Sequence, residues 1–439
     1  MPGGRALPSA GSGIEPAGAL SRPVPQDGPA PMRTVFWVST ALVFYTYLGY
    51  AVVLLLLAGV WQVWHDLKFG LGRGNRRRVP SPELPFVSLV FAAHNEEKVI
   101  GDKIRNCLAI DYPAGKLEIV VGCDGCEDRT SDILSAMRSP NLRIFNYRGR
   151  SGKPRTLNRL VPEARGGIIV FSDANTMFTP GAVRALVRHF SDESAGCVCG
   201  ALHLEPPGGG DESEGAYWRY ESFLKFLESR LNMMVGANGG IFAIRHDLYT
   251  PLPDGTVTDD FLISMQIRQK GWLVRYDPEA VAWEETSSLG QEFRRRVRIG
   301  AGNVHALRHT WKLLSPAAGL VSLSYWSHKI FRWLAPFAII AAFVSSVLLA
   351  PGDLIYAFFA GAAVWFLLTG LIGWRLERGR VRIRLLSIPC YFLSLNLALL
   401  CGVFQYFFGG QRGVWRPTAR AAAAAEASDP PQPGPDSRP

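Results

Sequence analysis

The chain lacks charged residues in four long stretches, and this absence excludes a wholly soluble protein. Roughly 20 apolar residues are enough to cross the hydrocarbon core of a bilayer. Buried core helices are the alternative, but charge-free stretches of this length are poorly explained in that way. We therefore predict four transmembrane helices, over Val35–Trp61, Leu334–Gly352, Leu354–Trp374 and Leu385–Gln411.

The chain also lacks two glycine-rich motifs that bind nucleotides. It contains neither the G-x-x-x-x-G-K-[ST] loop of P-loop NTPases nor the G-x-G-x-x-G fingerprint of dinucleotide-binding folds. Interpretation of the chain as an ATPase or a dehydrogenase therefore loses its main support.

Cysteine is scarce, with seven residues in the chain. The spacings of Cys123 with Cys126 and of Cys197 with Cys199 superficially suggest a zinc site. However, Cys123 ends an apolar segment, and Cys197 and Cys199 alternate within another. We predict buried free thiols, and we expect no disulfides in a chain that is mainly cytoplasmic.

Arginines gather beside the charge-free stretches and predict the orientation of the chain. By the positive-inside rule, loops rich in arginine face the cytoplasm. We therefore predict a multi-pass protein of the inner (plasma) membrane with its large soluble domain in the cytoplasm; the side of the C-terminal tail stays open. A nucleic-acid surface is a weaker explanation of the net charge of +10. The arginines are Arg73 and Arg76–Arg78 after the first stretch, and Arg375, Arg378, Arg380, Arg382 and Arg384 between the third and fourth.

These features divide the chain into six segments. Both ends are poor in apolar periodicity and are predicted to be disordered, and the short charge-free stretch Leu313–Ser327 is predicted to lie at the membrane interface. The predicted segments are a disordered 1–33, a transmembrane helix at 34–61, a soluble domain at 62–310, an interfacial segment at 311–333, three transmembrane helices at 334–411 and a disordered tail at 412–439.

Strand and helix patterns alternate through the first part of the soluble domain. Apolar segments at residues 86–92, 117–123, 141–147 and 168–171 read as strands, and each is followed by a helical pattern. Continuously apolar strands that alternate with helices indicate an α/β fold with a mostly parallel sheet covered on both faces. Thr179 and Pro180 are predicted to begin the helix after the fourth strand.

Polar side chains follow all four strands. Ligands bind beyond the carboxyl ends of the strands in such sheets, so these side chains are expected to meet at one edge. A lysine beside a helix N-terminus can balance phosphate charge, and carboxylate and amide oxygens suit Mg²⁺ or Mn²⁺. Ordinary turns could explain any one loop, but four loops together favour a nucleotide-diphosphate site. The residues are Asn95, Glu96, Asp124, Lys153, Asp173 and Asn175.

The same residues lie in motifs that resemble those of the family 2 glycosyltransferases. These are membrane-anchored inverting enzymes with the GT-A nucleotide-sugar fold, and they include cellulose, chitin, hyaluronan and poly-N-acetylglucosamine synthases. The resemblance covers residues 84–310 and implies a GT-A domain. The motifs, in chain order, are VSLVFAAHNEE, VVGCDGCEDRT, SGKPRTLN, FSDAN, TVTDDF and SLGQEFRRRVRIGAG.

The resemblance implies a role for each motif residue. The donor would be a nucleotide sugar, expected to be a UDP-sugar, and the acceptor a polysaccharide or a lipid-linked molecule. The first motif would contribute Ala93, Asn95 and Glu96 to donor binding, with Asp124 at the base and Lys153 at the phosphates. Asp173 and Asn175 would hold Mg²⁺ or Mn²⁺, Asp260 would be the catalytic base, and Asp259, Gln291, Arg294 and Arg295 would contact the acceptor or the diphosphate.

Three departures from the family pattern bear on function. Asn175 replaces the second acid of D-x-D, and Asp259 replaces the Glu of T-E-D. The Trp of Q-x-x-R-W, implied in polymer synthases to stack on the acceptor sugar, is missing beside Arg294. The missing Trp weakens the case for a processive synthase and favours single transfer or an unusual polymer. A non-catalytic nucleotide-sugar-binding subunit or sensor stays open; a transporter is weak, since the spans carry no charge.

Overall fold

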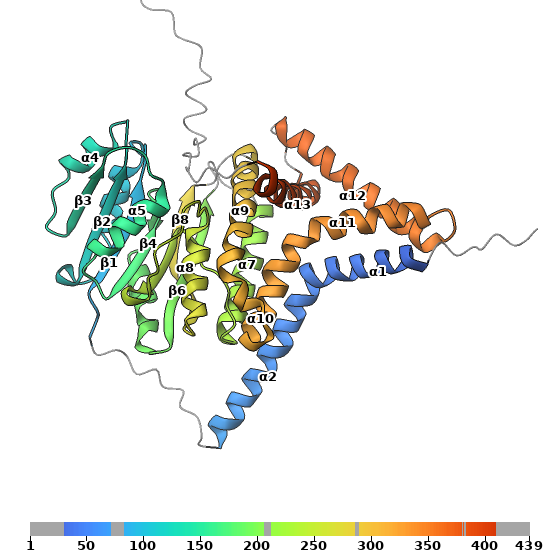
Figure 1. Ribbon diagram of the computed structural model, residues 1–439, viewed down its shortest axis with the longest axis horizontal. Helices are drawn as coiled ribbons and strands as arrows, with labels where there is room; N and C mark the ends of the chain where they lie inside the picture. Colours follow the sequence, from blue (N-terminus) through green and yellow to red (C-terminus); the bar gives the residue numbers. More distant parts are fainter. Residues whose placement is uncertain are drawn as a thin grey trace, which may run out of the picture.

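The computed structural model describes residues 30–71, 83–205, 212–285, 289–379, 381 and 383–409. An α/β domain forms one side of the molecule and a layer of long helices the other (Figure 1). The predicted disordered ends lie outside the described residues, apart from residues 30–33, which begin the first helix. The basic cluster Arg73–Arg78 also lies outside them.

The described part of the domain contains a sheet of eight strands in the order β3-β2-β1-β4-β7-β6-β8-β5. β2 is buried along its whole length, because helices pack their apolar faces against both sides of the sheet. The strands are β1 (Val87–Ala93), β2 (Leu117–Asp124), β3 (Leu142–Tyr147), β4 (Ile168–Ser172), β5 (Thr176–Phe178), β6 (Ala195–Glu205), β7 (Ile241–Arg245) and β8 (Leu273–Glu285).

The predicted parallel order holds for one half of the sheet. β3, β2, β1 and β4 pair parallel, in the β/α order that the sequence indicates. The other half is mixed, because β7 pairs antiparallel with both β4 and β6, and β5 pairs antiparallel with β8. β6 and β8 are again parallel. The sheet is therefore parallel where it forms the predicted nucleotide edge and mixed beyond it.

Helices cover the two faces of the sheet. Leu89 and Val90 are neighbours on β1, and they belong to two separate apolar clusters, as alternation along a strand requires. α5 packs in the cluster of Val90, whereas α3 and α6 pack in that of Leu89. The helices of the domain are α3 (Ile100–Leu108), α4 (Thr130–Ala136), α5 (Lys153–Leu160), α6 (Ala182–Val187), α7 (Glu212–Arg230), α8 (Asp259–Gln269) and α9 (Leu289–Thr310).

The start of α6 differs from the sequence prediction. Gly181, not Thr179, is the residue that precedes the helix. The hydroxyl of Thr179 donates to the carbonyl of Val281 on β8 at 3.1 Å instead. The short strand β5 was not predicted from the sequence. It pairs with β8, so Thr179, the next residue after β5, lies beside the sheet and not at the start of the helix.

Four helices in the described part of the chain are long and apolar enough to cross a membrane. The first runs from Ala30 to Gly70 and is longer than predicted. The second begins at Leu320, so part of the predicted interfacial segment is continuous with the span. Their parts are α1 (Ala30–Phe44), η1 (Tyr45–Gly49) and α2 (Tyr50–Gly70); α10 (Leu320–Ser324), η8 (Tyr325–Ile330) and α11 (Phe331–Leu349); then α12 (Leu354–Arg378) and α13 (Arg384–Phe408).

A buried polar cluster joins the domain to these long helices. The carboxylate of Glu228 on α7 accepts hydrogen bonds from Tyr50 on α2 at 2.7 Å and from Ser324 on α10 at 2.9 Å. His328 on η8 lies between Glu228, at 2.7 Å, and Glu221, at 3.1 Å. Glu221 also pairs with Arg332 on α11. Because these groups are buried and mutually bonded, they fix α7 against the candidate spans.

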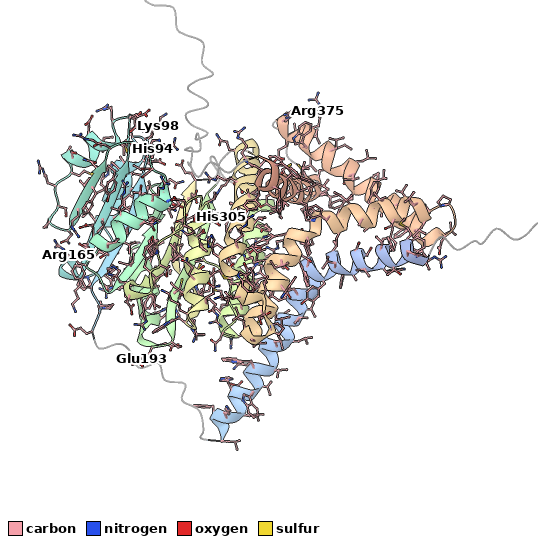
Figure 2. All side chains as sticks on the ribbon, in the orientation of Figure 1. His94, Lys98, Arg165, Glu193, His305 and Arg375 are labelled. Carbon is pink, nitrogen blue, oxygen red and sulfur yellow. The ribbon has the colours of Figure 1, made fainter. Side chains whose placement is uncertain are left out.

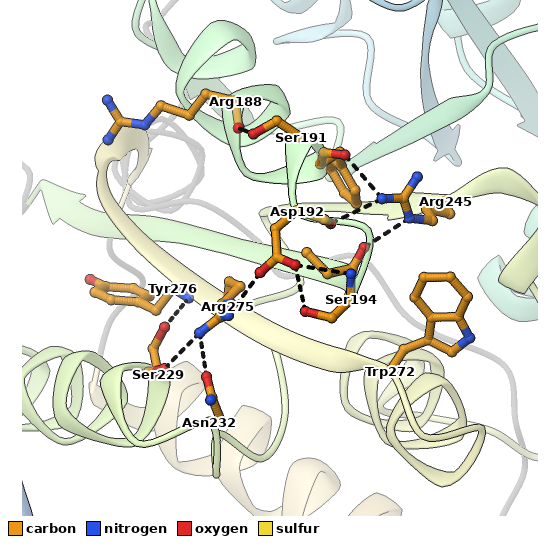
Figure 3. Close-up of polar contacts among 12 residues, drawn as sticks. Arg188, Ser191, Asp192, Ser194, Ser229, Asn232, Arg245, Trp272, Arg275 and Tyr276 are labelled. Atoms are coloured by element: carbon orange, nitrogen blue, oxygen red, sulfur yellow. Dashed lines mark hydrogen bonds and ion pairs between the residues drawn. The ribbon is translucent and has the colours of Figure 1, made fainter. Parts of the chain in front are cut away.

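A second polar cluster anchors the C-terminal end of α7 (Figure 3). Arg275 on β8 donates to the carboxylate of Asp192 at 2.9 Å and to the carbonyl of Ser229 at 3.3 Å. Arg275 also bonds the side chain of Asn232, whose φ of 59° turns the chain after α7. These bonds fix the position of the first residues before the loop 233–240. This loop leads into the site described next.

Candidate active site

A cavity of about 420 Å³ opens at the carboxyl ends of β1, β2 and β4 and extends to α9 and α13. His94 marks this edge of the sheet in Figure 2, whereas Arg165 and Glu193 lie at the opposite edge. The strand ends therefore meet where the sequence predicts. Of the predicted site residues, those that line the cavity are Ala93, Glu96, Asp124, Lys153, Asp173, Asn175, Asp259, Asp260 and Arg295.

Three predicted site residues are not among those that line the cavity. Asn95 adopts a left-handed conformation with φ of 54°, and its side-chain oxygen accepts a bond from the amide of Glu127 at 2.9 Å, so it shapes the loop. Gln291 is half-buried on α9, and Arg294 is exposed. The same helix presents other arginines to the cavity, namely Arg295, Arg296 and Arg298.

Asp124 holds the loop in front of α5. Its Oδ1 accepts bonds from the amide and hydroxyl of Ser151 at 2.7 and 2.8 Å, and its Oδ2 accepts one from the amide of Gly152 at 2.7 Å. Gly152 has a φ of 91°, which favours glycine at this point. The buried carboxylate therefore positions the start of α5; a direct bond from Asp124 to a nucleotide base stays a prediction.

Lys153 forms the centre of a compact charged group. Its ammonium lies 2.6 Å from Asp173 Oδ1 and 3.0 Å from Asp259 Oδ2. Burial alone would lower the pKa of Lys153, but the two carboxylates outweigh burial and raise that pKa. Lys153 therefore stays charged at the first turn of α5, where amide groups also favour an anion.

Asp260 is the acid most suited to accept a proton in this cavity. It lies in the first turn of α8, and a Cβ atom added to Gly239 would stand 3.2 Å from Asp260 Oδ2 and 3.7 Å from Asp173 Oδ2. The two carboxylates thus face the same glycine. Burial, and then the charge of Asp259, raise the pKa of Asp260 to about 6. A base with a pKa near the working pH is efficient in proton transfer.

Lys103 stabilises the turn that carries Asp173. This fully buried lysine on α3 donates to Ser172 Oγ at 2.8 Å and also to the carbonyl of Thr176. Burial lowers the pKa of Lys103, because a charged ammonium loses its hydration there. The two bonds enclose residues 173–175, so they hold the predicted metal-binding turn in one conformation.

Asp173 and Asn175 offer hard oxygen ligands suited to Mg²⁺ or Mn²⁺. The amide group of Asn175 donates to Glu284 Oε1 at 3.1 Å, an arrangement that leaves its carbonyl oxygen for other partners. The described residues contain no cluster of three or more His, Cys, Asp or Glu side chains suited to a metal. Asp173 and Asn175 alone would leave the remaining ligand positions of such an ion to water and to the phosphates of a bound donor, an arrangement common for Mg²⁺.

Basic residues of α9 line the cavity near this turn. Arg295 Nη2 lies 3.7 Å from Glu284 Oε2, and the negative charge of this carboxylate raises the pKa of Arg295. Burial, followed by the charge of Arg295, lowers the pKa of Arg298. Because guanidinium groups bind phosphate in a bidentate manner, this side of the cavity suits a diphosphate.

The cavity continues beyond Asp260 toward the membrane helices, a part that our sequence reasoning missed. α7 and the candidate spans provide its lining here. Tyr220 on α7 serves in packing, with its hydroxyl donating to the carbonyl of Tyr47. Trp218 lines the cavity, and its buried Nε1 has no hydrogen-bond partner among the described residues. The lining residues of this part are Tyr217, Trp218, Glu221, Lys225, Lys329 and Gln405.

Comparison with known families and sequences identifies relatives. The family model described as "Glycosyltransferase like family 2" matches residues 82–302. A probable glycosyltransferase, YdaM, from Bacillus subtilis is 26% identical in an alignment of 311 residues that covers 63% of this chain and 67% of YdaM. The beta-monoglucosyldiacylglycerol synthase of Synechocystis is 26% identical, over 60% of this chain and 57% of the relative. The poly-beta-1,6-N-acetyl-D-glucosamine synthase of Staphylococcus aureus is 24% identical, over 51% and 56%.

The match to two of these relatives thus spans little more than half of their length. Among solved structures, the mannosyltransferase PcManGT from Pyrobaculum calidifontis, in complex with GDP-Man and Mn²⁺, matches with a TM-score of 0.64 and 18% identity. The match covers 86% of this chain and 99% of that protein. This likeness shows that the α/β domain has the GT-A fold.

Proposed function

The chain belongs to glycosyltransferase family 2, and we propose that it is an inverting, metal-dependent transferase at the inner membrane. It moves a sugar from a nucleotide donor, most simply a UDP-sugar, to a polysaccharide or lipid-linked acceptor. One observation carries the proposal: Asp260 and Asp173 face the same glycine in a cavity that runs from the strand ends to the candidate spans. Donor and acceptor can therefore meet at Asp260 from opposite ends.

Asp260 is the proposed base. In inverting transfer, an acceptor oxygen attacks the anomeric carbon of the donor, and the bond from that carbon to the diphosphate oxygen breaks. The acceptor hydroxyl loses its proton, which passes to Asp260. Burial keeps the Asp260 carboxylate basic enough for this step, since its pKa is raised to about 6.

The departing nucleoside diphosphate needs positive charge around it. Lys153 at the start of α5 and Arg295 and Arg298 on α9 line the cavity on that side and are suited to bind it. Asp173 and Asn175 would hold Mg²⁺ or Mn²⁺, which would neutralise charge on the phosphates when bound. The ion pairs of Lys153 with Asp173 and Asp259 hold the lysine beside the proposed phosphate site.

A non-catalytic subunit that binds nucleotide sugar is the second candidate. One observation favours it: the residue at the second metal-ligand position is an amide that is bonded to Glu284. Such a protein would bind the donor and leave it intact.

A donor panel separates the two candidates. The purified full-length protein in proteoliposomes is supplied with UDP- and GDP-sugars, with Mn²⁺, with Mg²⁺ or with EDTA, and nucleoside diphosphate release is measured. Metal-dependent release from at least one donor supports the enzyme. Donor binding without release, by calorimetry on the same samples, contradicts it and supports the binding subunit.

A further inference from the structure

We propose that the acceptor end of the cavity binds a lipid whose head group carries a phosphate close to the accepting hydroxyl, and that Lys225 and Lys329 are its phosphate ligands. This inference rests on the proposed transferase function. It adds the chemical class of the acceptor, which the comparisons do not assign.

The two lysines reach the cavity from different elements. Lys225 lies on α7 and is 7% exposed, and its ammonium donates to the side-chain oxygen of Asn238. Lys329 lies within the helix run Leu320–Leu349, a candidate span, and its ammonium is 5.9 Å from the centre of the Phe261 ring. Phe261 directly follows Asp260, so Lys329 lies beside the first turn of α8, which carries the proposed base.

Neither ammonium group has a carboxylate partner in the described part of the chain. Lys225 bonds a neutral amide, and the contact found for Lys329 is with an aromatic face. The one acidic residue of this part of the lining, Glu221, is bonded to His328 at 3.1 Å and to Arg332. Lys225 is buried and Lys329 is half-buried, and neither forms an ion pair with a described carboxylate, so an anionic ligand would stabilise both ammonium groups.

The lysines are separate from the donor phosphate site. Asp173 follows β4, whereas Lys225 is bonded to Asn238, whose side chain bonds the carbonyl of Gly200 on β6. β7 lies between β4 and β6 in the sheet. Lys153, which is paired with Asp173 after β4, and Lys225, which is linked through Asn238 to β6, therefore lie on opposite sides of the loop that contains Gly239. An anion at Lys225 and Lys329 therefore belongs to the acceptor and not to the donor diphosphate.

The lining of this end points to a lipid as the carrier of the phosphate. Lys329 and Gln405 both lie in helices that can cross a membrane, and both line the cavity. A membrane lipid could place its head group here while its chains stay beside the spans. A neutral glycolipid would leave both ammonium groups unpaired, and a soluble uronic-acid oligosaccharide would not need the membrane helices.

The test measures transfer from the donor that the wild-type protein uses, in proteoliposomes of defined composition. The phosphate-bearing acceptors are phosphatidylglycerol, phosphatidylinositol and a glycosylated polyprenyl diphosphate. The comparison acceptors are diacylglycerol, monoglucosyldiacylglycerol and a soluble glucuronic-acid oligosaccharide. The variants are Lys225→Gln, Lys329→Gln and the conservative Lys225→Arg, with Lys312→Gln as the control, because Lys312 is exposed and outside the cavity lining.

We expect the wild type to prefer a phosphate-bearing lipid. Each Gln variant should raise the KM for that lipid by about 10- to 100-fold, the range expected for a lost charge-assisted hydrogen bond. Lys225→Arg and Lys312→Gln should stay within a few-fold of wild type, and donor hydrolysis by water should be unchanged in all variants.

Equal or better transfer to a neutral lipid or to the soluble oligosaccharide would overturn the inference, as would unchanged KM values in both Gln variants. Donor hydrolysis separates this failure from failure of the proposed function. A wild-type protein that hydrolyses its donor but ignores the phosphate lipids contradicts the acceptor class alone. A protein that neither hydrolyses a donor nor transfers its sugar to any acceptor contradicts both proposals.

Discussion

Asn175 stands where the family pattern has an acid, and its neighbour Glu284 explains why an amide suits this position. Its amide donates to Glu284 at 3.1 Å, and a carboxylate in that place would face Glu284 with like charge. The neutral amide therefore keeps an oxygen ligand at the turn without repulsion. Asp173, with its two carboxylate oxygens, would then be the main protein ligand of the proposed metal ion.

Substitution at the two positions should therefore have unequal effects. Asp173→Ala removes the charged ligand and the partner of Lys153, and we expect transfer to fall by at least about 1,000-fold, the loss typical of a key electrostatic group. Asn175→Ala should lower transfer by about tenfold and raise the Mn²⁺ concentration needed for half-maximal rate. Metal titrations of both variants check this, and equal losses would contradict it.

The raised pKa of Asp260 predicts a pH dependence. A base works in its deprotonated form, and the pKa of Asp260 is raised to about 6, so the carboxylate is protonated below that pH. We expect kcat/KM to rise about tenfold per pH unit below pH 6 and to level off above it. Rates measured from pH 4.5 to 8 test this. A rate that is flat down to pH 4.5 would contradict the role of Asp260.

Sequence reasoning placed some site residues and missed others for a physical reason. Asp124, Lys153 and Asp173 follow strands, and parallel strands bring their ends together, so their meeting was predictable. Lys225 and Lys329 come from α7 and from a candidate span, and no local pattern marks a contact between elements so distant in the chain. Periodicity alone also did not decide which arginines of α9 face the cavity: Arg295 lines it and Arg294 does not.

At the scale of elements, the loop before β7 sets the distance between the two key carboxylates. A Cβ at Gly239 would crowd Asp260 at 3.2 Å and approach Asp173 at 3.7 Å. We expect Gly239→Ala to lower kcat by about 100-fold, since small displacements of reacting groups have effects of this size. The protein should still fold and bind its donor. Donor affinity lost in parallel with kcat would contradict this explanation.

The contact of α7 with the candidate spans should depend on the Glu228 cluster. Glu228→Ala removes the acceptor shared by Tyr50, Ser324 and His328. Loss of one partner from a buried charged cluster costs about 3–5 kcal/mol, so we expect a large fall in the free energy of unfolding in detergent micelles. Glu228→Gln, which keeps the shape, should lose less. Unchanged stability of the Ala variant would show that the cluster does not hold the two parts together.

The parallel half of the sheet and the four long helices were predictable from patterning, whereas the mixed half was not. β1 to β4 alternate with helices, and the parallel order follows from that alternation. β7 also follows a helix, α7, yet it pairs antiparallel with β4 and β6, and these pairings depend on contacts that no local pattern marks. The continuation of the second span to Leu320 was also concealed, because His328, Lys329 and Arg332 interrupt the apolar pattern there.

At the scale of the whole molecule, the arrangement predicts that the catalytic domain and the donor share one side of the membrane. From the arginines beside the spans and the positive-inside rule, we propose that this side is the cytoplasm. We expect a cysteine introduced at the exposed Glu193 to resist an impermeant thiol reagent in intact cells and to react in inverted vesicles. Reaction in intact cells would place the domain outside.

The most direct test of the proposed enzyme compares wild type with Asp260→Asn, using a donor from the panel and native membrane lipids as acceptors. Asp254→Asn is the matched control, because Asp254 is an exposed acid paired with Arg155 outside the cavity lining. The account predicts that Asp260→Asn transfers sugar at least about 100-fold more slowly than wild type while it binds the donor equally well, as expected for loss of a general base. Asp254→Asn should match wild type. Equal transfer by wild type and Asp260→Asn would contradict the account.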